Sequence, residues 1–367
     1  MGLVVLAGLI SCQQKKETGP VTIGINEAHF ANVPLEKVLS GSEFVPLELT
    51  RESALSEFAM FLNWTSGYYL MDQYKSKTVF QFDKKGGFIR TIGKAGQGPG
   101  EFTNLGEALV TKNGVKILSG LTDTKIIGYD NKGQYLRTDQ ILARNSNSFA
   151  MNPKSGDYYF FVTGYQHLIQ RVDGKSLQPA DSFLIRNTRL TTAGVLTFST
   201  TSQGAVLFYQ PFDNRIFRLE KNMINLAYRF DVGPSTPLYD DMDADLQTKM
   251  VTQRELWFIY KALENSEWLY LLVAQQIAMD ENESQFYSLL YQKKTGKIYQ
   301  LPDTPDPGPL FRPAFSLGDD NILYTSVQPK IINQSAEWKA EFKKRGITLT
   351  PDGNYVVVKI PLGKLVQ

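Results

Sequence analysis

The feature that most constrains the fold is a short apolar strand that ends in an acidic or polar turn and recurs along the chain. The first four copies begin about 40 to 50 residues apart, which is the period of a four-stranded propeller blade. The six copies span residues 79–83, 126–130, 168–173, 216–220, 288–291 and 355–359. Each turn favours a hairpin, because Asp and Gly supply side-chain caps and positive φ. The pattern predicts an all-β, six-bladed β-propeller.

The last two intervals are longer, and each contains a segment with approximately helical spacing of apolar residues. The first segment is 239–263, which has four aspartates near its start, where acidic side chains favour a helix dipole. The second is 335–345, with Ser335 as N-cap and Gly346 as the stop. We predict two short helical insertions, one from the fifth blade and one from the sixth.

A propeller must also close its ring. Residues 43–49 form a lone strand ahead of the first full blade. Pairing this strand with the last blade, beside the strand that ends near Leu362, would remove an exposed edge. We therefore expect the propeller to span residues 42–363 and to be monomeric.

The N-terminus carries the only cysteine, Cys12, directly after an apolar stretch at 3–10 that is too short to span a bilayer. Residues 9–12 resemble the lipobox of bacterial lipoproteins, in which the cysteine is acylated and becomes residue one. No basic residue precedes the apolar stretch, which leaves the true start codon open. The alternative is a buried N-terminal strand with an incidental cysteine.

The lipobox resemblance predicts a signal peptide at 1–11 and a lipid anchor with a tether at 12–41, of which the polar part 13–19 is flexible. Gln13, rather than Asp, follows the cysteine, and in lipoprotein sorting this implies release from the inner membrane. The expected location is the cell envelope, as an outer-membrane lipoprotein that is periplasmic or surface-exposed. The expected membrane contact is this anchor.

The composition excludes two broad classes of protein. With 42% apolar and 12% aromatic residues the chain can fill a large core, so it is not disordered. The 39 Lys and Arg residues nearly balance the 37 Asp and Glu residues, and no long basic run is present. We therefore predict no nucleic-acid partner.

The most distinctive stretch, residues 79–102, reads VFQFDKKGGFIRTIGKAGQGPGEF. It resembles a family of bacterial six-bladed propellers related to NHL repeats, many of which are lipoproteins. The matching motif consists of Gly93, Gly96, Gly98, Pro99, Gly100, Glu101 and Phe102. Residues 310–329 are similar to the last blade of that family, whereas the middle blades match by pattern alone.

The glycine-rich motif has two interpretations. A phosphate-binding loop must follow a strand and open a helix, and Pro99 together with the β-rich sequence after Phe102 disfavours such a helix. We therefore expect a structural crossover between adjacent blades, with Phe102 filling a gap in the core.

The sequence provides few groups for ordinary catalysis. His29 and His167 are its only histidines, and no G-x-S-x-G motif is present. Zinc sites need three or four ligands, usually His or Cys. The aspartates at 241–245 begin like a calcium loop, but Leu246 and Thr252 occupy the Gly and Glu positions. We predict no catalytic residues, no metal ligands and no cofactor.

Aromatic residues with polar neighbours could stack on sugar rings or anchor a protein partner, or could simply belong to the core. The candidates are Trp64, Tyr68, Tyr69, Tyr165 and Trp257. The sequence does not assign the ligand-binding residues.

The leading hypothesis is a non-catalytic surface lipoprotein that binds a protein, peptide or glycan through a propeller face. The alternative is an enzyme of the lactonase or lyase type that holds a metal in the central channel, as some six-bladed propellers do. A third class is a structural subunit of an envelope complex.

Overall fold

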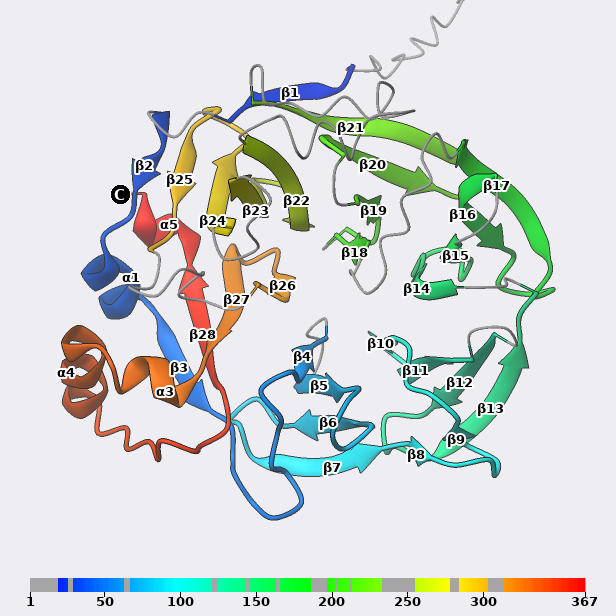
Figure 1. Ribbon diagram of the computed structural model, residues 1–367, viewed down its shortest axis with the longest axis horizontal. Coiled ribbons are helices and arrows are strands. Elements are labelled where there is room, and N and C mark those ends of the chain that lie inside the picture. The colour runs from blue at the N-terminus through cyan, green and yellow to red at the C-terminus, as the bar shows by residue number, and fades with distance from the viewer. Residues whose placement is uncertain are drawn as a thin grey trace, which may run out of the picture.

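The computed structural model shows six sheets arranged radially around a central axis (Figure 1), which confirms the predicted all-β, six-bladed β-propeller. The residues that it describes are 19–25, 29–62, 67–120, 124–142, 146–162, 166–185, 197–201, 203–210, 213–232, 255–277, 284–302 and 313–366.

Each blade is a sheet of antiparallel strands, which follow one another in order from the axis to the outside of the propeller. Blades one to three are β4 (Met60–Phe61), β5 (Tyr68–Asp72), β6 (Thr78–Phe82) and β7 (Phe88–Ile92); β10 (Ala108–Thr111), β11 (Gly114–Ser119), β12 (Lys125–Tyr129) and β13 (Tyr135–Gln140); and β14 (Ser146–Met151), β15 (Tyr158–Val162), β16 (His167–Val172) and β17 (Pro179–Ile185). Blades four to six are β18 (Phe198–Thr200), β19 (Val206–Phe208), β20 (Arg215–Glu220) and β21 (Met223–Asp231); β22 (Glu255–Glu264), β23 (Trp268–Ile277), β24 (Ser284–Gln292) and β25 (Ile298–Gln300); and β26 (Ser316–Leu317), β27 (Ile322–Val327), β28 (Val356–Pro361) and β3 (Glu43–Pro46).

The recurring apolar strand of the sequence is the third strand of every blade: β6, β12, β16, β20, β24 and β28. In the first two blades the turn after this strand is stabilised by the aspartate that begins it. The Asp83 carboxylate accepts hydrogen bonds from the backbone N–H groups of Lys85 and Gly87, and Asp130 does the same in blade two. The side chain therefore stabilises the hairpin turn without help from distant residues.

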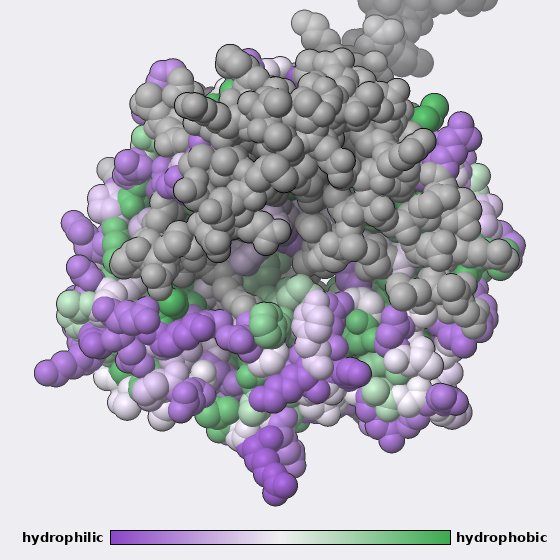
Figure 2. All heavy atoms as spheres, in the orientation of Figure 1, coloured by the Kyte–Doolittle hydropathy of each residue, from purple (hydrophilic) through white to green (hydrophobic). Residues whose placement is uncertain are grey.

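The core is divided among the blade interfaces. Six clusters of buried hydrophobic residues occur in the described part of the chain, one between each pair of neighbouring blades. Both faces of each sheet are therefore covered, which explains why the inner strands read as nearly continuous apolar runs. Figure 2 shows hydrophilic side chains around the coloured rim of one face and hydrophobic ones nearer its centre.

The ring closes as predicted. The strand β3 pairs antiparallel with β28, with Val45 opposite Val357 and Phe44 opposite Val358. The N-terminal part of the chain thus supplies the outermost strand of the last blade, and this pairing covers the outer edge of β28.

Residues 21–41 differ from the predicted tether. The strand β1 (Val21–Gly24) pairs in parallel with β21, and β2 (Ala31–Asn32) pairs in parallel with β25. Buried Ile23 and Ile25 anchor this segment between blades four and five. We call β1, β2, α1 (Leu35–Gly41) and β3 the belt, because they follow the outside of blades four, five and six (Figure 1).

The second predicted insertion is helical. Helix α3 (Pro329–Ile332) is followed by α4 (Ala336–Lys344), between β27 and β28 of blade six. The Ser335 side chain accepts a hydrogen bond from the backbone N–H of Trp338, and Trp338 and Phe342 pack on Phe44. A short α5 (Leu362–Leu365) follows β28. Among the described residues, no helix is long and apolar enough to cross a membrane.

The first predicted insertion is partly wrong. Residues 239–254 lie outside the described residues, but Trp257 and Tyr260 belong to the strand β22 and not to a helix. The pairing of β22 with β23 shifts register between Ile259 and Lys261, which leaves Tyr260 as a bulge. This extra residue makes the apolar spacing of the strand look helical.

Candidate functional site

A large cavity lies at one mouth of the central channel. Every innermost strand turns into the second strand at the same end of the propeller, which we call the hairpin face. A cavity of about 780 Å³ opens there, and the innermost strands of five blades contribute to its lining. Each of these strands provides one of the residues Val110, Met151, Thr200, Leu263 and Leu317. This mouth cavity has the size of a small-molecule site.

The rim of the mouth cavity carries more positive than negative charge. Lys112, Lys116 and Arg137 line it, and Lys116 lies 5.5 Å from the ring centre of Tyr158. Arg137 is paired with Asp139 at 3.1 Å, and within the part of the chain that the structure describes the two lysines of the rim have no ion-pair partner. The rim therefore favours anionic or strongly polar ligands.

Glu264, the acidic residue among the described residues of this rim, is already neutralised. Its carboxylate accepts from Arg218 at 2.6 Å, from Lys293 at 2.6 Å and from the hydroxyl of Tyr228 at 2.5 Å. Burial alone would raise the pKa of Glu264, but Lys293 and Arg218 together with these hydrogen bonds hold it below its ordinary value. This cluster joins blades four and five, and a side pocket of about 220 Å³ lies beside it.

A second, smaller cavity of about 30 Å³ lies deeper in the channel. It shares Leu109, Val110 and Thr200 with the mouth cavity, so the two are adjacent. We call it the channel cavity. Its apolar wall includes the aromatic rings of Phe61, Phe149 and Phe198.

Besides Thr200, three polar residues line the channel cavity: Lys261, Glu107 and Ser199. Lys261 lies two residues before Leu263 on β22, about 7 Å deeper than the mouth. The Glu107 carboxylate accepts a hydrogen bond from the backbone N–H of Phe149 at 2.7 Å. Within the described residues, Lys261 makes no hydrogen bond or ion pair, and its nearest opposite charge is Glu107.

The low-dielectric surroundings change the proton affinity of both ionisable groups. Burial raises the pKa of Glu107 to about 7, partly opposed by its hydrogen bonds and by Lys261. Burial lowers the pKa of Lys261 to about 8, partly opposed by Glu107. Each group therefore exchanges protons near neutral pH, which is characteristic of functional sites as well as of strained ion pairs.

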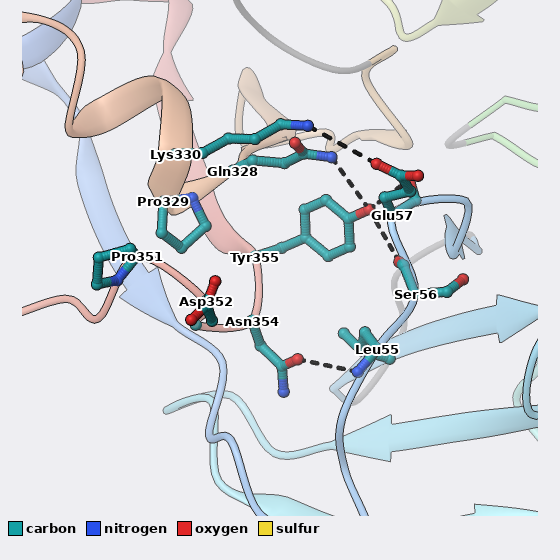
Figure 3. Close-up of a pocket in the computed structure, with 11 residues that line it drawn as sticks. Leu55, Ser56, Glu57, Gln328, Pro329, Lys330, Pro351, Asp352, Asn354 and Tyr355 are labelled. Atoms are coloured by element: carbon teal, nitrogen blue, oxygen red, sulfur yellow. Dashed lines mark hydrogen bonds and ion pairs between the residues drawn. The ribbon is translucent and has the colours of Figure 1, made fainter.

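A further pocket of about 230 Å³ lies where the ring closes, between residues 55–57 and 328–330 (Figure 3). Its polar groups are engaged with the protein itself. The Tyr355 hydroxyl donates to the carbonyl of Glu57 at 2.8 Å, and Asn354 bonds the backbone of Glu48, Ser53 and Leu55. We therefore interpret these contacts as a latch that holds the β3–β4 connection, and not as a ligand site.

The glycine-rich motif lies between blades one and two. Its two short strands, β8 (Lys94–Ala95) and β9 (Glu101–Phe102), pair in parallel, and no helix follows among the described residues. The Glu101 carboxylate accepts from the Gly98 N–H and from Lys94, both at 2.9 Å. Phe102 is buried between the two blades, and a side chain at Gly93 would collide with its ring. This geometry is that of a structural crossover.

The aromatic candidates from the sequence do not form a site. Tyr68 and Tyr69 are buried in the core, and Trp257 is buried with its ring 5.1 Å from that of Tyr287. Trp64 and Tyr165 lie outside the described residues.

The two histidines are not brought together. His29 is exposed just before β2, and His167 is half-buried at the start of β16. Among the described residues, no group of three or more His, Cys, Asp or Glu side chains is placed to hold a metal ion. Cys12 and the aspartates at 241–245 lie outside those residues.

Sequence reasoning missed the residues of the channel cavity. One signal was present: Lys261 is the only charged residue in the otherwise apolar run 256–263. A lysine inside a strand that is buried on both faces needs a reason to be there.

Comparison with known proteins assigns a family. A family model described as a domain of unknown function, DUF4934, matches residues 20–361. The chain belongs to this family. No curated protein matches the chain significantly. The match begins at residue 20, just before β1, so the family model includes the belt as well as the six blades. The predicted relation to NHL repeats stays a prediction.

Solved structures resemble this DUF4934 member in fold. A Bacteroides fragilis protein described as exported is 16% identical with a TM-score of 0.65, covering 93% of this chain and 99% of that one. An auxiliary nutrient binding protein of Bacteroides ovatus is 13% identical with a TM-score of 0.45, covering 87% and 76%. A virginiamycin B lyase of Staphylococcus aureus is 12% identical with a TM-score of 0.44, covering 87% and 99%. The first likeness supports the propeller fold.

Proposed function

We propose that this protein is a non-catalytic binding protein of the bacterial cell envelope, which takes its ligand at the hairpin face. The observation that carries the proposal is the mouth cavity of about 780 Å³, to which the innermost strands of five blades contribute. A cavity fixed by strand ends is preorganised, so little ordering is needed when a ligand binds. The basic rim favours a polar or acidic glycan or peptide.

The location in the envelope is part of the same proposal. The lipobox-like sequence before Cys12 supports a lipid anchor on the outer membrane. Substitution Cys12→Ser is expected to abolish incorporation of radioactive palmitate and to move the protein from the membrane to the soluble fraction. Palmitate labelling that survives this substitution would contradict the anchor.

Ligand binding is tested with the full chain carrying Cys12→Ser, applied to a glycan array and to a peptide array. A Thr200→Trp variant fills the mouth cavity, because Thr200 lies at the end of β18 within its lining. We expect binding to a defined group of probes and its loss in this variant.

The matched control is Thr91→Trp, on the exposed side of the outer strand of blade one, which should bind as the parent does. Circular dichroism checks that both variants fold. Failure of both arrays to show binding, or equal binding by Thr200→Trp, would refute the mouth cavity as the ligand site.

A further inference from the structure

The channel cavity contains polar groups that the blades themselves do not use. Ser199 is 5% exposed, and its Oγ lies near the hydroxyl of buried Tyr209 but makes no hydrogen bond of normal geometry. A buried hydroxyl without a partner destabilises the fold unless something binds it. Lys261 lines the same cavity and, in the described part of the chain, has no ion-pair partner.

The positions of these groups show that they are gathered from distant parts of the ring. Lys261 comes from blade five, Ser199 from blade four, and Glu107 from the connection that leads into blade two. They lie within a wall that includes three phenylalanine rings. A cation and a hydroxyl in such surroundings attract a small anionic group strongly, because water competes little there.

We propose that the channel cavity binds the carboxylate group of an acidic ligand through Lys261 and Ser199, while the rest of that ligand occupies the mouth cavity. The inference rests on the proposed binding function and specifies its ligand class. The volume of about 30 Å³ accommodates about two water-sized atoms, which matches the two oxygens of a carboxylate. A carboxylate presents two oxygens to this space, whereas a phosphate or sulfate group presents three or more.

Glu107 does not oppose such a ligand. Its carboxyl group is held by the Phe149 N–H, and because burial raises its pKa to about 7, it can take up a proton near neutral pH. Once Glu107 is protonated, Lys261 is the remaining charged group among the described residues that line the channel cavity, and Glu107 can itself donate a hydrogen bond to a carboxylate.

The experiment uses the full chain with Cys12→Ser, labelled with ¹³C at the lysine ε carbons. The Lys261 signal is assigned by its loss in Lys261→Met, or in Lys261→Gln should the first variant not fold. Sodium formate and D-galacturonate are titrated as acidic probes, and sodium chloride and D-galactose serve as the salt and neutral controls.

We expect the Lys261 signal to move saturably with formate and galacturonate and to be unaffected by galactose or chloride. Ser199→Ala should weaken formate binding about tenfold, since a hydrogen bond to a charged group is lost. Lys339→Met, on the exposed side of α4, should leave formate binding unchanged.

The proposal is overturned if the Lys261 signal does not respond to either acid, or if chloride moves it equally. It is also overturned if many lysines shift together, which would report ionic strength only. A probe from the arrays that needs the mouth cavity but leaves the Lys261 signal in place would preserve the proposed function and refute the carboxylate site. Loss of all array binding in Met151→Trp, at a position that lines the mouth cavity only, together with a normal formate response would preserve both.

Discussion

At the scale of single residues, Glu107 and Lys261 reduce the stability of the folded chain near neutral pH. Because burial raises the pKa of Glu107 from 4.5 to about 7, the folded chain loses stability relative to the unfolded chain as the pH rises from 4.5 through 7. Because burial lowers the pKa of Lys261 from 10.5 to about 8, the folded chain loses stability relative to the unfolded chain as the pH falls from 10.5 through 8. Between pH 7 and 8 the Glu107 carboxylate is ionised and the Lys261 amine is protonated, and burial disfavours both charged forms.

Lys261→Met is therefore expected to raise the free energy of unfolding at neutral pH by about 1 kcal/mol, because a poorly solvated charge is replaced by an apolar side chain of similar length. Urea denaturation measures the difference, with Lys339→Met as the exposed control. A loss of stability in Lys261→Met would show instead that the lysine serves the fold.

Glu264 behaves in the opposite sense. Its folded pKa lies below 4.5, so its stabilising contribution is complete above that value and is lost as the pH falls through the folded pKa. Glu264→Gln should reduce the free energy of unfolding at neutral pH by about 3 kcal/mol, because Arg218 and Lys293 lose their counter-charge. The difference from the parent should shrink below pH 4.5, whereas exposed Glu267→Gln should change little. A pH-independent loss would rule out this explanation.

At the scale of elements, the latch in Figure 3 holds the β3–β4 connection against blade six. Asn354 is 6% exposed and makes three hydrogen bonds to the backbone of residues 48–55. Asn354→Ala should reduce the free energy of unfolding by about 2 kcal/mol in urea denaturation, because the bonded backbone groups lose their partner. Asn131→Ala removes one exposed hydrogen bond to Lys112 and should change it by less than about 0.5 kcal/mol. Equal effects of the two variants would contradict the latch.

The hairpins could be predicted from the sequence because their causes are local. Asp83 caps the turn that immediately follows it, and Ser335 caps the helix that immediately follows it. The sequence of β22 favours a helix because a single bulge at Tyr260 disturbs the alternation of apolar and polar residues. The channel cavity could not be predicted, because Lys261 and Ser199 meet only after two blades have packed around a common axis.

At the scale of the whole molecule, the belt ties three blades together from outside. Ile23 of β1 is 2% exposed between blades four and five. Ile23→Asp should release β1, because an unpaired charge cannot remain in that cluster. Hydrogen exchange should then quicken at the amides of β21 that pair with β1, Tyr228–Asp231, and remain slow in β28. Thr22→Asp, at an exposed position of β1, is the control, and uniform quickening in all blades would refute a local role.

The belt also determines how a membrane-bound propeller would bear mechanical load. With acyl chains on Cys12, only residues 13–20 would separate the lipid from β1, a reach of at most about 30 Å. A force applied through this short linker acts first on β1, then on β2 and last on β3. The pairings of β1 with β21 and of β2 with β25 must therefore break before a pulling force reaches the β3–β28 pairing that closes the ring.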